Sequence, residues 1–88
     1  MDFYGRIKEI CPLETGTSER GTWQRQTVVV ESFENPNNFL AIDAIGERIQ
    51  QLGKFTEGNP VKASFSVTSR KGEKGYFTSA TLWEIKPL

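Results

Sequence analysis

The chain has 88 residues, the size of one small domain, so we expect a single domain over residues 1–88. Its 11 basic and 11 acidic residues cancel, and it contains 1 cysteine and no histidine. This composition excludes an internal disulfide framework and the usual zinc ligand sets, and it lacks the commonest general base of enzymes. We therefore expect a protein that is not an enzyme and that holds no metal or cofactor.

The N-terminal segment, Met1–Gly5, has no basic stretch followed by an apolar one. No apolar run in the sequence approaches the length that spans a membrane. A lone cysteine is typical of a reducing compartment. Together these patterns predict a cytoplasmic protein without a membrane partner.

In chain order, the first extended segment covers residues 3–13. Its apolar alternation slips by one residue at Ile10, which predicts a bulge in the strand. Residues 14–22 are polar and contain glycine, so we expect a loop there. The second strand is expected over residues 23–34, where three successive valines are typical of a strand covered on both faces.

A turn rich in asparagine and proline is expected at residues 35–38. It leads into a third strand over residues 39–45. A short helix is then expected over residues 47–52, because apolar positions recur there one turn apart. Gly53 follows as its C-terminal stop.

The fourth strand is expected over residues 61–69, where every second side chain is apolar as far as Val67. Residues 70–75 contain two glycines, a pattern that predicts a hairpin loop. The fifth strand is expected over residues 76–85. Late in that strand Trp83 lies two positions before an isoleucine, and we expect its indole to pack in the core.

Five strands with one short helix between the third and the fourth are the element order of an OB-fold barrel. We therefore predict an all-β, five-stranded Greek-key barrel in which the helix covers an open end. Such barrels bind single-stranded nucleic acid on the face of the second and third strands. The loops between strands one and two and between strands four and five form the rim of that face.

Cations and aromatic rings fall on these elements, and single-strand binding needs both, the cations for phosphates and the rings for base stacking. The candidate nucleic-acid-binding residues are Trp23, Arg25, Phe39, Arg70, Lys71, Lys74, Tyr76 and Arg20. Each also has an ordinary structural explanation, because the rings can pack in a core and the charged hairpin can be solvated. Tyr76 and Phe77 face opposite sides of a strand, so one must point outward, and tyrosine tolerates water better.

Several short segments stand in the order and spacing of a known group of proteins: Gly5-Arg6-Ile7, Thr15–Ser18 before Trp23, Gln26–Glu31, Ile45-Gly46-Glu47, Glu57-Gly58 before Val61, and Ser69-Arg70 before Gly75-Tyr76-Phe77. In these segments the chain resembles a family of small bacterial OB-fold proteins of unknown function, which are similar to bacterial single-stranded DNA-binding proteins. The resemblance implies an OB barrel, a homo-oligomer, and contacts from Trp23, Arg25 and Arg70 to a single strand. It departs at Ile45, where those proteins carry a tryptophan, and in the flexible acidic tail that recruits their partners, so we expect no recruiting role of that type.

Two hypotheses remain open from the sequence. The first is a non-enzymatic module that binds single-stranded DNA or RNA by base stacking and phosphate contacts. The alternative is a structural or protein-interaction OB module that binds no nucleic acid, which the zero net charge favours.

Overall fold

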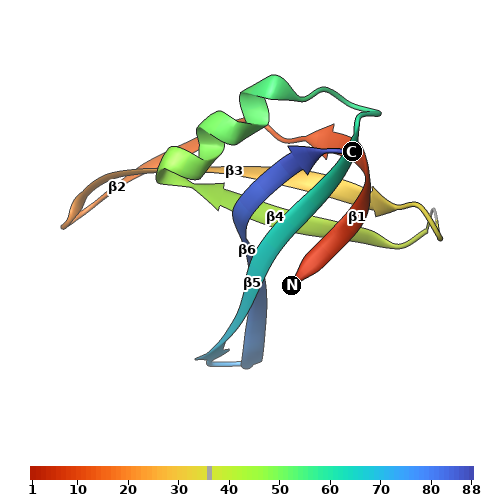
Figure 1. Ribbon diagram of the computed structural model, residues 1–88. Coiled ribbons are helices and arrows are strands. Elements are labelled where there is room, and N and C mark those ends of the chain that lie inside the picture. Colours follow the sequence, from red (N-terminus) through yellow and green to blue (C-terminus); the bar gives the residue numbers. More distant parts are fainter. Residues whose placement is uncertain (36) are drawn as a thin grey trace.

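The computed structural model describes residues 1–35 and 37–88 of the chain (Figure 1). Pro36, in the turn expected at residues 35–38, lies outside the described residues. The elements in chain order are β1 (Asp2–Ile10), β2 (Glu14–Ser18), β3 (Gly21–Ser32), β4 (Phe39–Ile45), the 3-10 helix η1 (Gly46–Lys54), β5 (Pro60–Gly72) and β6 (Gly75–Pro87).

Hydrogen bonding between five of the strands forms a closed ring. Strand β1 pairs antiparallel with both β3 and β5, β3 pairs with β4, and β5 pairs with β6. A parallel pairing of β4 with β6 at Asp43 and Thr81 closes the ring. Strand β2 pairs with Gly21–Arg25 of β3, the part of that strand that extends beyond its pairing with β1. This arrangement, with η1 between β4 and β5, confirms the predicted OB barrel.

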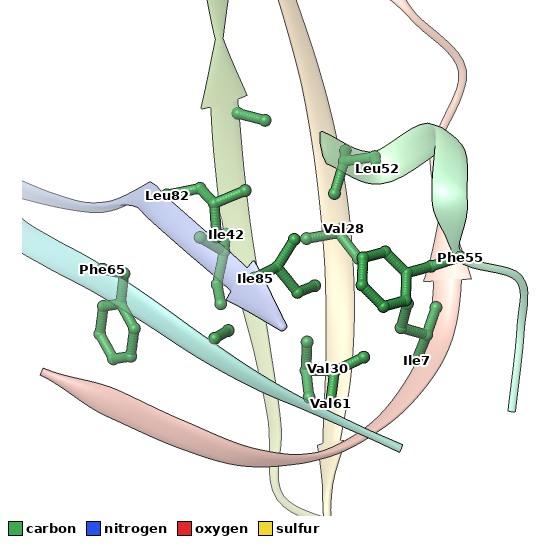
Figure 2. Close-up of a cluster of buried hydrophobic side chains, with 12 residues drawn as sticks. Ile7, Val28, Val30, Ile42, Leu52, Phe55, Val61, Phe65, Leu82 and Ile85 are labelled. Atoms are coloured by element: carbon green, nitrogen blue, oxygen red, sulfur yellow. The ribbon is translucent and has the colours of Figure 1, made fainter. Parts of the chain in front are cut away.

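The core lies inside this ring and consists of apolar side chains from alternate strand positions (Figure 2). On β3, Val28 and Val30 have no exposed surface, and on β4 Ile42 is equally buried. The helix η1 contributes Leu52 to the cluster, and Phe55 follows directly after the helix. These two residues close one end of the barrel, which is the role predicted for the helix.

Two segments predicted to be loops are largely strand. Residues 14–22 contain the whole of β2, which pairs with β3 from Glu14 opposite Arg25 to Ser18 opposite Gly21. The prediction was wrong because the threonines of this segment favour extended structure, although its overall composition is polar. The segment at residues 70–75 is a loop only at Glu73 and Lys74, since β5 continues to Gly72 and β6 begins at Gly75.

The helix η1 also differs from its prediction. It begins at Gly46, which has a φ of 60°, and it extends to Lys54 as a 3-10 helix. Gly53 therefore lies inside the helix and does not end it. The chain leaves η1 at Phe55, whose backbone is extended and whose N–H donates to the Leu52 carbonyl.

Two irregularities in strand register determine which side chains face outward. The first lies in β1 between Ile7 and Glu9, which confirms the predicted bulge. The second lies where β6 opposes Ser64 and Phe65 of β5, and it leaves Trp83 as the extra residue of β6. Leu82 and Ile85 are both buried, and Trp83 between them is 58% exposed. The prediction that Trp83 packs in the core was therefore wrong.

Val67 ends the apolar alternation predicted for the fourth strand, and it is 45% exposed. Its strand position shares a face with Phe65, which is buried, so the alternation itself was correct. Beyond Phe65, however, the β5–β6 ribbon extends past the wall of the barrel, as Figure 1 shows. Both faces of this part of the ribbon are solvated, so an inward position no longer means a buried one.

Candidate nucleic-acid interface

The candidate interface is the outer face of β3 and β4, on which alternate residues of both strands point away from the core. The register places four pairs along this face: Arg25 with Ile45, Thr27 with Asp43, Val29 with Ala41, and Glu31 with Phe39. Trp23 extends the face beyond Arg25. We call this surface, from Trp23 to Phe39, the outer face.

Trp23 is an exposed ring at one end of the outer face. Its side chain is 43% exposed, and it lies across Gly16 of β2, where an added Cβ would be 2.3 Å from the ring. The Arg25 guanidinium carbon lies 5.9 Å from the ring centroid. Trp23, Gln24, Arg25 and Ile45 line a shallow hollow of about 240 Å³. Glycine on the neighbouring strand thus leaves space for an indole held flat and partly open to solvent.

Arg25 does not point freely into solvent, because it is bound to Glu14 of β2. Its Nε donates to the Glu14 carboxylate at 3.0 Å, and Nη2 donates to the same oxygen. These hydrogen bonds, together with the attraction of the carboxylate charge, raise the pKa of the guanidinium above its ordinary value. A phosphate that approaches Arg25 must therefore compete with Glu14.

The middle of the outer face is small, apolar or acidic. Thr27 donates its hydroxyl to the Asp43 carboxylate at 2.7 Å, and Asp43 is half-buried rather than fully solvated. Val29 and Ala41 follow, and Glu31 comes next. A phosphate backbone would be repelled along this centre line, so its contacts must come from the flanks.

Phe39 stands at the other end of the outer face from Trp23. It is 44% exposed, and the Lys8 ammonium lies 4.1 Å from its ring centroid. Lys8 sits at the bulge of β1, where the register slips between Ile7 and Glu9. Sequence reasoning found the bulge but did not identify Lys8, because the partner of a bulged residue cannot be read from alternation.

The tip of the β5–β6 ribbon carries a cation and a ring on each of its two faces. Arg70 is paired with Phe77 and Lys71 with Tyr76, and Lys74 lies in the turn. All these residues are exposed, including Tyr76 at 74% and Phe77 at 61%. One of the two rings was expected to face outward, and both are exposed because the ribbon projects beyond the barrel (Figure 1).

The ribbon tip and Trp23 lie on opposite sides of the contact between β4 and β6. The two strands β4 and β6 run parallel where Asp43 meets Thr81. From this point β6 leads back toward the tip, and β4 leads forward to Ile45, next to Arg25. Figure 1 shows the β2–β3 and β5–β6 hairpins extending in different directions, and Arg20 lies in the turn of the former. The predicted residues thus flank the face and do not form one cluster.

The cations of the two hairpin tips are available to an anionic ligand. Across residues 1–35 and 37–88, the ion pairs are those of Arg25 with Glu14, Lys62 with Asp2 and Lys86 with Glu84. None of these pairs involves Arg20, Arg70, Lys71 or Lys74. The zero net charge of the chain therefore coexists with exposed cations at both hairpin tips. Glu19 stands beside Arg20 in one turn, so the excess of positive charge lies at the β5–β6 tip, where Arg70, Lys71 and Lys74 outnumber Glu73.

A closed OB barrel with exposed rings and flanking cations defines the structural class of this protein. The chain belongs to the family described as Domain of unknown function (DUF3127), which matches residues 2–86. Its structure is similar to the crystal structure of a small single-stranded DNA-binding protein from Streptomyces coelicolor, with a TM-score of 0.50 and 18% sequence identity. That similarity covers 99% of this chain and 91% of the other. No curated protein matches the sequence significantly.

The helical part of the described chain offers no membrane-spanning segment, because η1 is too short and too polar for one.

Proposed function

We propose that this protein is a non-enzymatic OB module that binds single-stranded nucleic acid across its outer face. The observation that carries the proposal is the placement of exposed, supported rings at both ends of that face, Trp23 beside Arg25 and Phe39 beneath Lys8. Flat rings accept any base by stacking, and nearby cations accept the phosphates. The structural similarity to a single-stranded DNA-binding protein supports the same function.

The charge distribution supports a path that enters and leaves over the hairpins. The centre of the face holds Asp43 and Glu31, whereas Arg20 lies in one hairpin turn and Arg70, Lys71 and Lys74 lie at the tip of the other. A single strand that stacks on the end rings therefore meets its phosphate contacts at the flanks. Tyr76 and Phe77 add rings at the second flank.

A single copy offers few stacking positions, and each stacked base contributes only about 1–3 kcal/mol. Repetition of the face in a homo-oligomer would supply the remaining affinity through multivalency. We therefore propose a homo-oligomer acting in the cytoplasm on single-stranded DNA or RNA.

The test is a titration of labelled oligo-dT and oligo-U with the purified protein, followed by fluorescence anisotropy. We expect binding at micromolar protein and low salt that weakens steeply as salt is raised. A Trp23→Ala variant should weaken binding between about fivefold and 150-fold, the equivalent of one stacked base. Because Trp23 is exposed, this variant should keep the melting temperature of the native protein within a few degrees, as checked by circular dichroism.

Two results would contradict the proposal. One is the absence of binding at low salt, and the other is binding that is indifferent to salt. If oligonucleotides do not bind and Trp23→Ala instead disrupts a complex with a copurifying protein, the protein-interaction alternative explains the exposed rings.

A further inference from the structure

Trp83 is the most exposed tryptophan of the chain, and its position is determined by the bulge in β6. The bulge places Trp83 outward between the buried residues Leu82 and Ile85. Because residues two apart on a strand share a face, Trp83 lies on the same side of β6 as Thr81. Thr81 is paired with Asp43, which belongs to the outer face. The indole is therefore on the continuation of the outer face.

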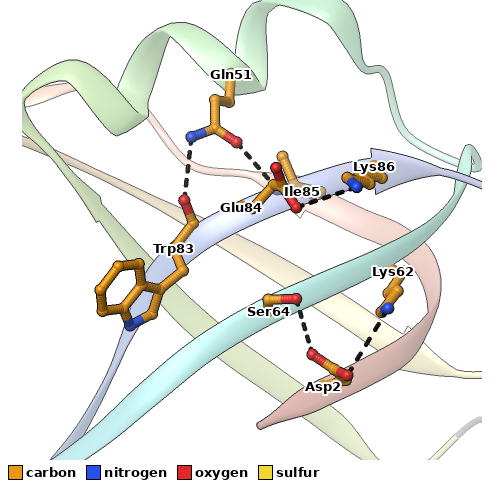
Figure 3. Close-up of polar contacts among 8 residues, drawn as sticks. All are labelled: Asp2, Gln51, Lys62, Ser64, Trp83, Glu84, Ile85 and Lys86. Carbon is orange, nitrogen blue, oxygen red and sulfur yellow. Dashed lines mark hydrogen bonds and ion pairs between the residues drawn. The ribbon is translucent and has the colours of Figure 1, made fainter.

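The indole and its backbone are held by three neighbours. The indole Nε1 donates to the hydroxyl of Ser66 on β5. From η1, the amide of Gln51 donates to the Trp83 carbonyl at 3.2 Å and accepts from the Ile85 N–H at 3.0 Å (Figure 3). Gln51 thus bonds two backbone groups of β6 next to the bulge. An exposed ring that is fixed at its edge and along its backbone loses little entropy when a ligand stacks on it.

A cation accompanies this ring. The Arg48 guanidinium of η1 lies 5.4 Å from the indole centroid, and Arg48 is itself exposed. The two residues border a hollow of about 530 Å³ that is also lined by Ser64, Ser66 and Phe65. Glu84 lies at its edge, and the Lys86 ammonium approaches the Glu84 carboxylate at 3.4 Å (Figure 3). Met1 also lines the hollow, and its ammonium donates to the Phe65 carbonyl at 3.0 Å. The hollow thus combines an aromatic wall and hydroxyl groups with a net positive charge, from Arg48 and the Met1 ammonium against Glu84.

The position of the hollow connects it to the Trp23 end of the outer face. Arg48 follows Ile45 by three residues, and Ile45 is paired with Arg25 and lines the hollow beside Trp23. Since β4 and β6 run parallel from Asp43 and Thr81, Ile45 and Trp83 lie at the same end of that strand pair. A nucleic-acid strand that passes from Trp23 over Ile45 therefore reaches Trp83.

We infer that Trp83 and Arg48 form a further base-stacking position on the path of the single strand. Trp83 provides the stacking surface, and Arg48 provides the contact to the adjoining phosphate. This inference rests on the proposed nucleic-acid function and deepens it, because it assigns the strand a second ring at the η1 end of the face. Single-stranded nucleic acid fits the site because it combines flat bases with phosphates, which match the aromatic wall and the net positive charge.

The test compares oligo-dT binding by the native protein with binding by Trp83→Ala, measured by anisotropy at low salt. We expect Trp83→Ala to weaken binding between about fivefold and 150-fold. Trp83→Phe keeps a ring and loses the bond to Ser66, and it should bind within about threefold of the native protein. The matched control is Tyr4→Ala, which removes another exposed ring with a nearby cation, Lys62 at 5.9 Å, on the β1–β5 side of the barrel. This control should leave binding unchanged.

A second measurement reports on the indole directly. The chain has 2 tryptophans, so Trp23→Phe leaves Trp83 as the only one. Oligo-dT should quench the fluorescence of this variant in parallel with the anisotropy change, and the quenching should diminish in a form that also carries Arg48→Gln. Melting temperatures measured by circular dichroism confirm that each variant is folded.

The outcomes separate this inference from the proposed function. If the native protein binds and Trp83→Ala binds equally well, or if binding leaves Trp83 fluorescence unchanged, the inference is wrong and the proposed function stands. If the native protein binds no oligonucleotide at low salt, both are wrong. If Trp83→Ala leaves oligonucleotide binding intact but dissociates an oligomer, the ring belongs to an interface between copies of the chain, which also overturns the inference.

Discussion

Neutralising the tip of the β5–β6 ribbon should reduce the salt dependence of nucleic-acid binding. The change is the triple substitution Arg70→Gln, Lys71→Gln and Lys74→Gln. All three residues are exposed, Lys74 in the two-residue turn and Arg70 and Lys71 among the last three residues of β5, so the substitutions should leave the core intact. If each cation contacts a phosphate, its loss prevents the release of counterions from that phosphate.

The size of the change in salt dependence depends on the number of phosphate contacts that are lost. For single strands the slope of log K against log salt is about −0.7 per neutralised phosphate, so three lost contacts should make the slope less steep by about 2. Between about 50 and 200 mM salt, this corresponds to roughly a twentyfold smaller loss of affinity. Arg70 and Lys71 lie on opposite faces of the ribbon. A strand that contacts one face only would lose about 1.4 units, from Lys74 and one of these two residues.

The assay is anisotropy with labelled oligo-dT at several salt concentrations. The matched control makes the same change in net charge elsewhere, with Lys54→Gln, Lys62→Gln and Lys86→Gln. Of these control residues, Lys62 and Lys86 are paired with carboxylates, and Lys54 lies in the last turn of η1. The control slope should stay within about 0.5 of the native one. A tip variant with the native slope, or a control with an equal reduction, would refute the assignment of phosphate contacts to the tip.

Other consequences of the structure can be tested separately. Glu14→Gln frees Arg25 from its carboxylate partner and should tighten oligo-dT binding by about two- to fivefold at low salt, and weaker binding would contradict this. Partial burial and the carboxylate of Glu9 raise the pKa of the Cys11 thiol, so its alkylation by iodoacetamide should reach half its maximal rate at a higher pH in the folded protein than in urea. Gly5→Ala would place a Cβ 1.9 Å from a backbone oxygen of β3, and urea unfolding should show a loss of at least about 3 kcal/mol, with a loss below about 1 kcal/mol counting against the close packing of β1 on β3.

The barrel could be predicted from the sequence because its core positions obey a simple alternation. Val28 and Val30 on β3 and Ile42 on β4 recur every second residue, and all three are fully buried. The position of η1 between β4 and β5 then restricts the connections of the strands to the OB order. Local pattern and overall fold agree in this part of the chain, which makes the prediction reliable.

The strand β2 could not be predicted in the same way. Its residues are exposed or half-buried on both faces of the strand, so no apolar alternation marks it. It is stabilised by pairing with β3, by the ion pair of Glu14 with Arg25, and by the Trp23 ring across Gly16. These are contacts between segments, and composition alone does not reveal them.

Trp83 shows why the binding surface is harder to predict than the core. A single extra residue in β6 reverses the direction of every side chain after it. Alternation counted back from the buried Ile85 places Trp83 inside the barrel, whereas alternation counted forward from the buried Leu82 places it outside. The same holds for Lys8 at the bulge of β1, which lies beside Phe39.

Both bulges place a cation and a ring together at the end of a strand face, Lys8 with Phe39 and Arg48 with Trp83. A bulge leaves a backbone group unpaired, and that group must find another partner. At Trp83, Gln51 of η1 bonds the carbonyl of the bulged residue and the N–H of Ile85, so η1, which also carries Arg48, is fixed against β6. Removing Gln51 should release the indole and Arg48 together, which an increase in acrylamide quenching of Trp83 in a Trp23→Phe background would detect.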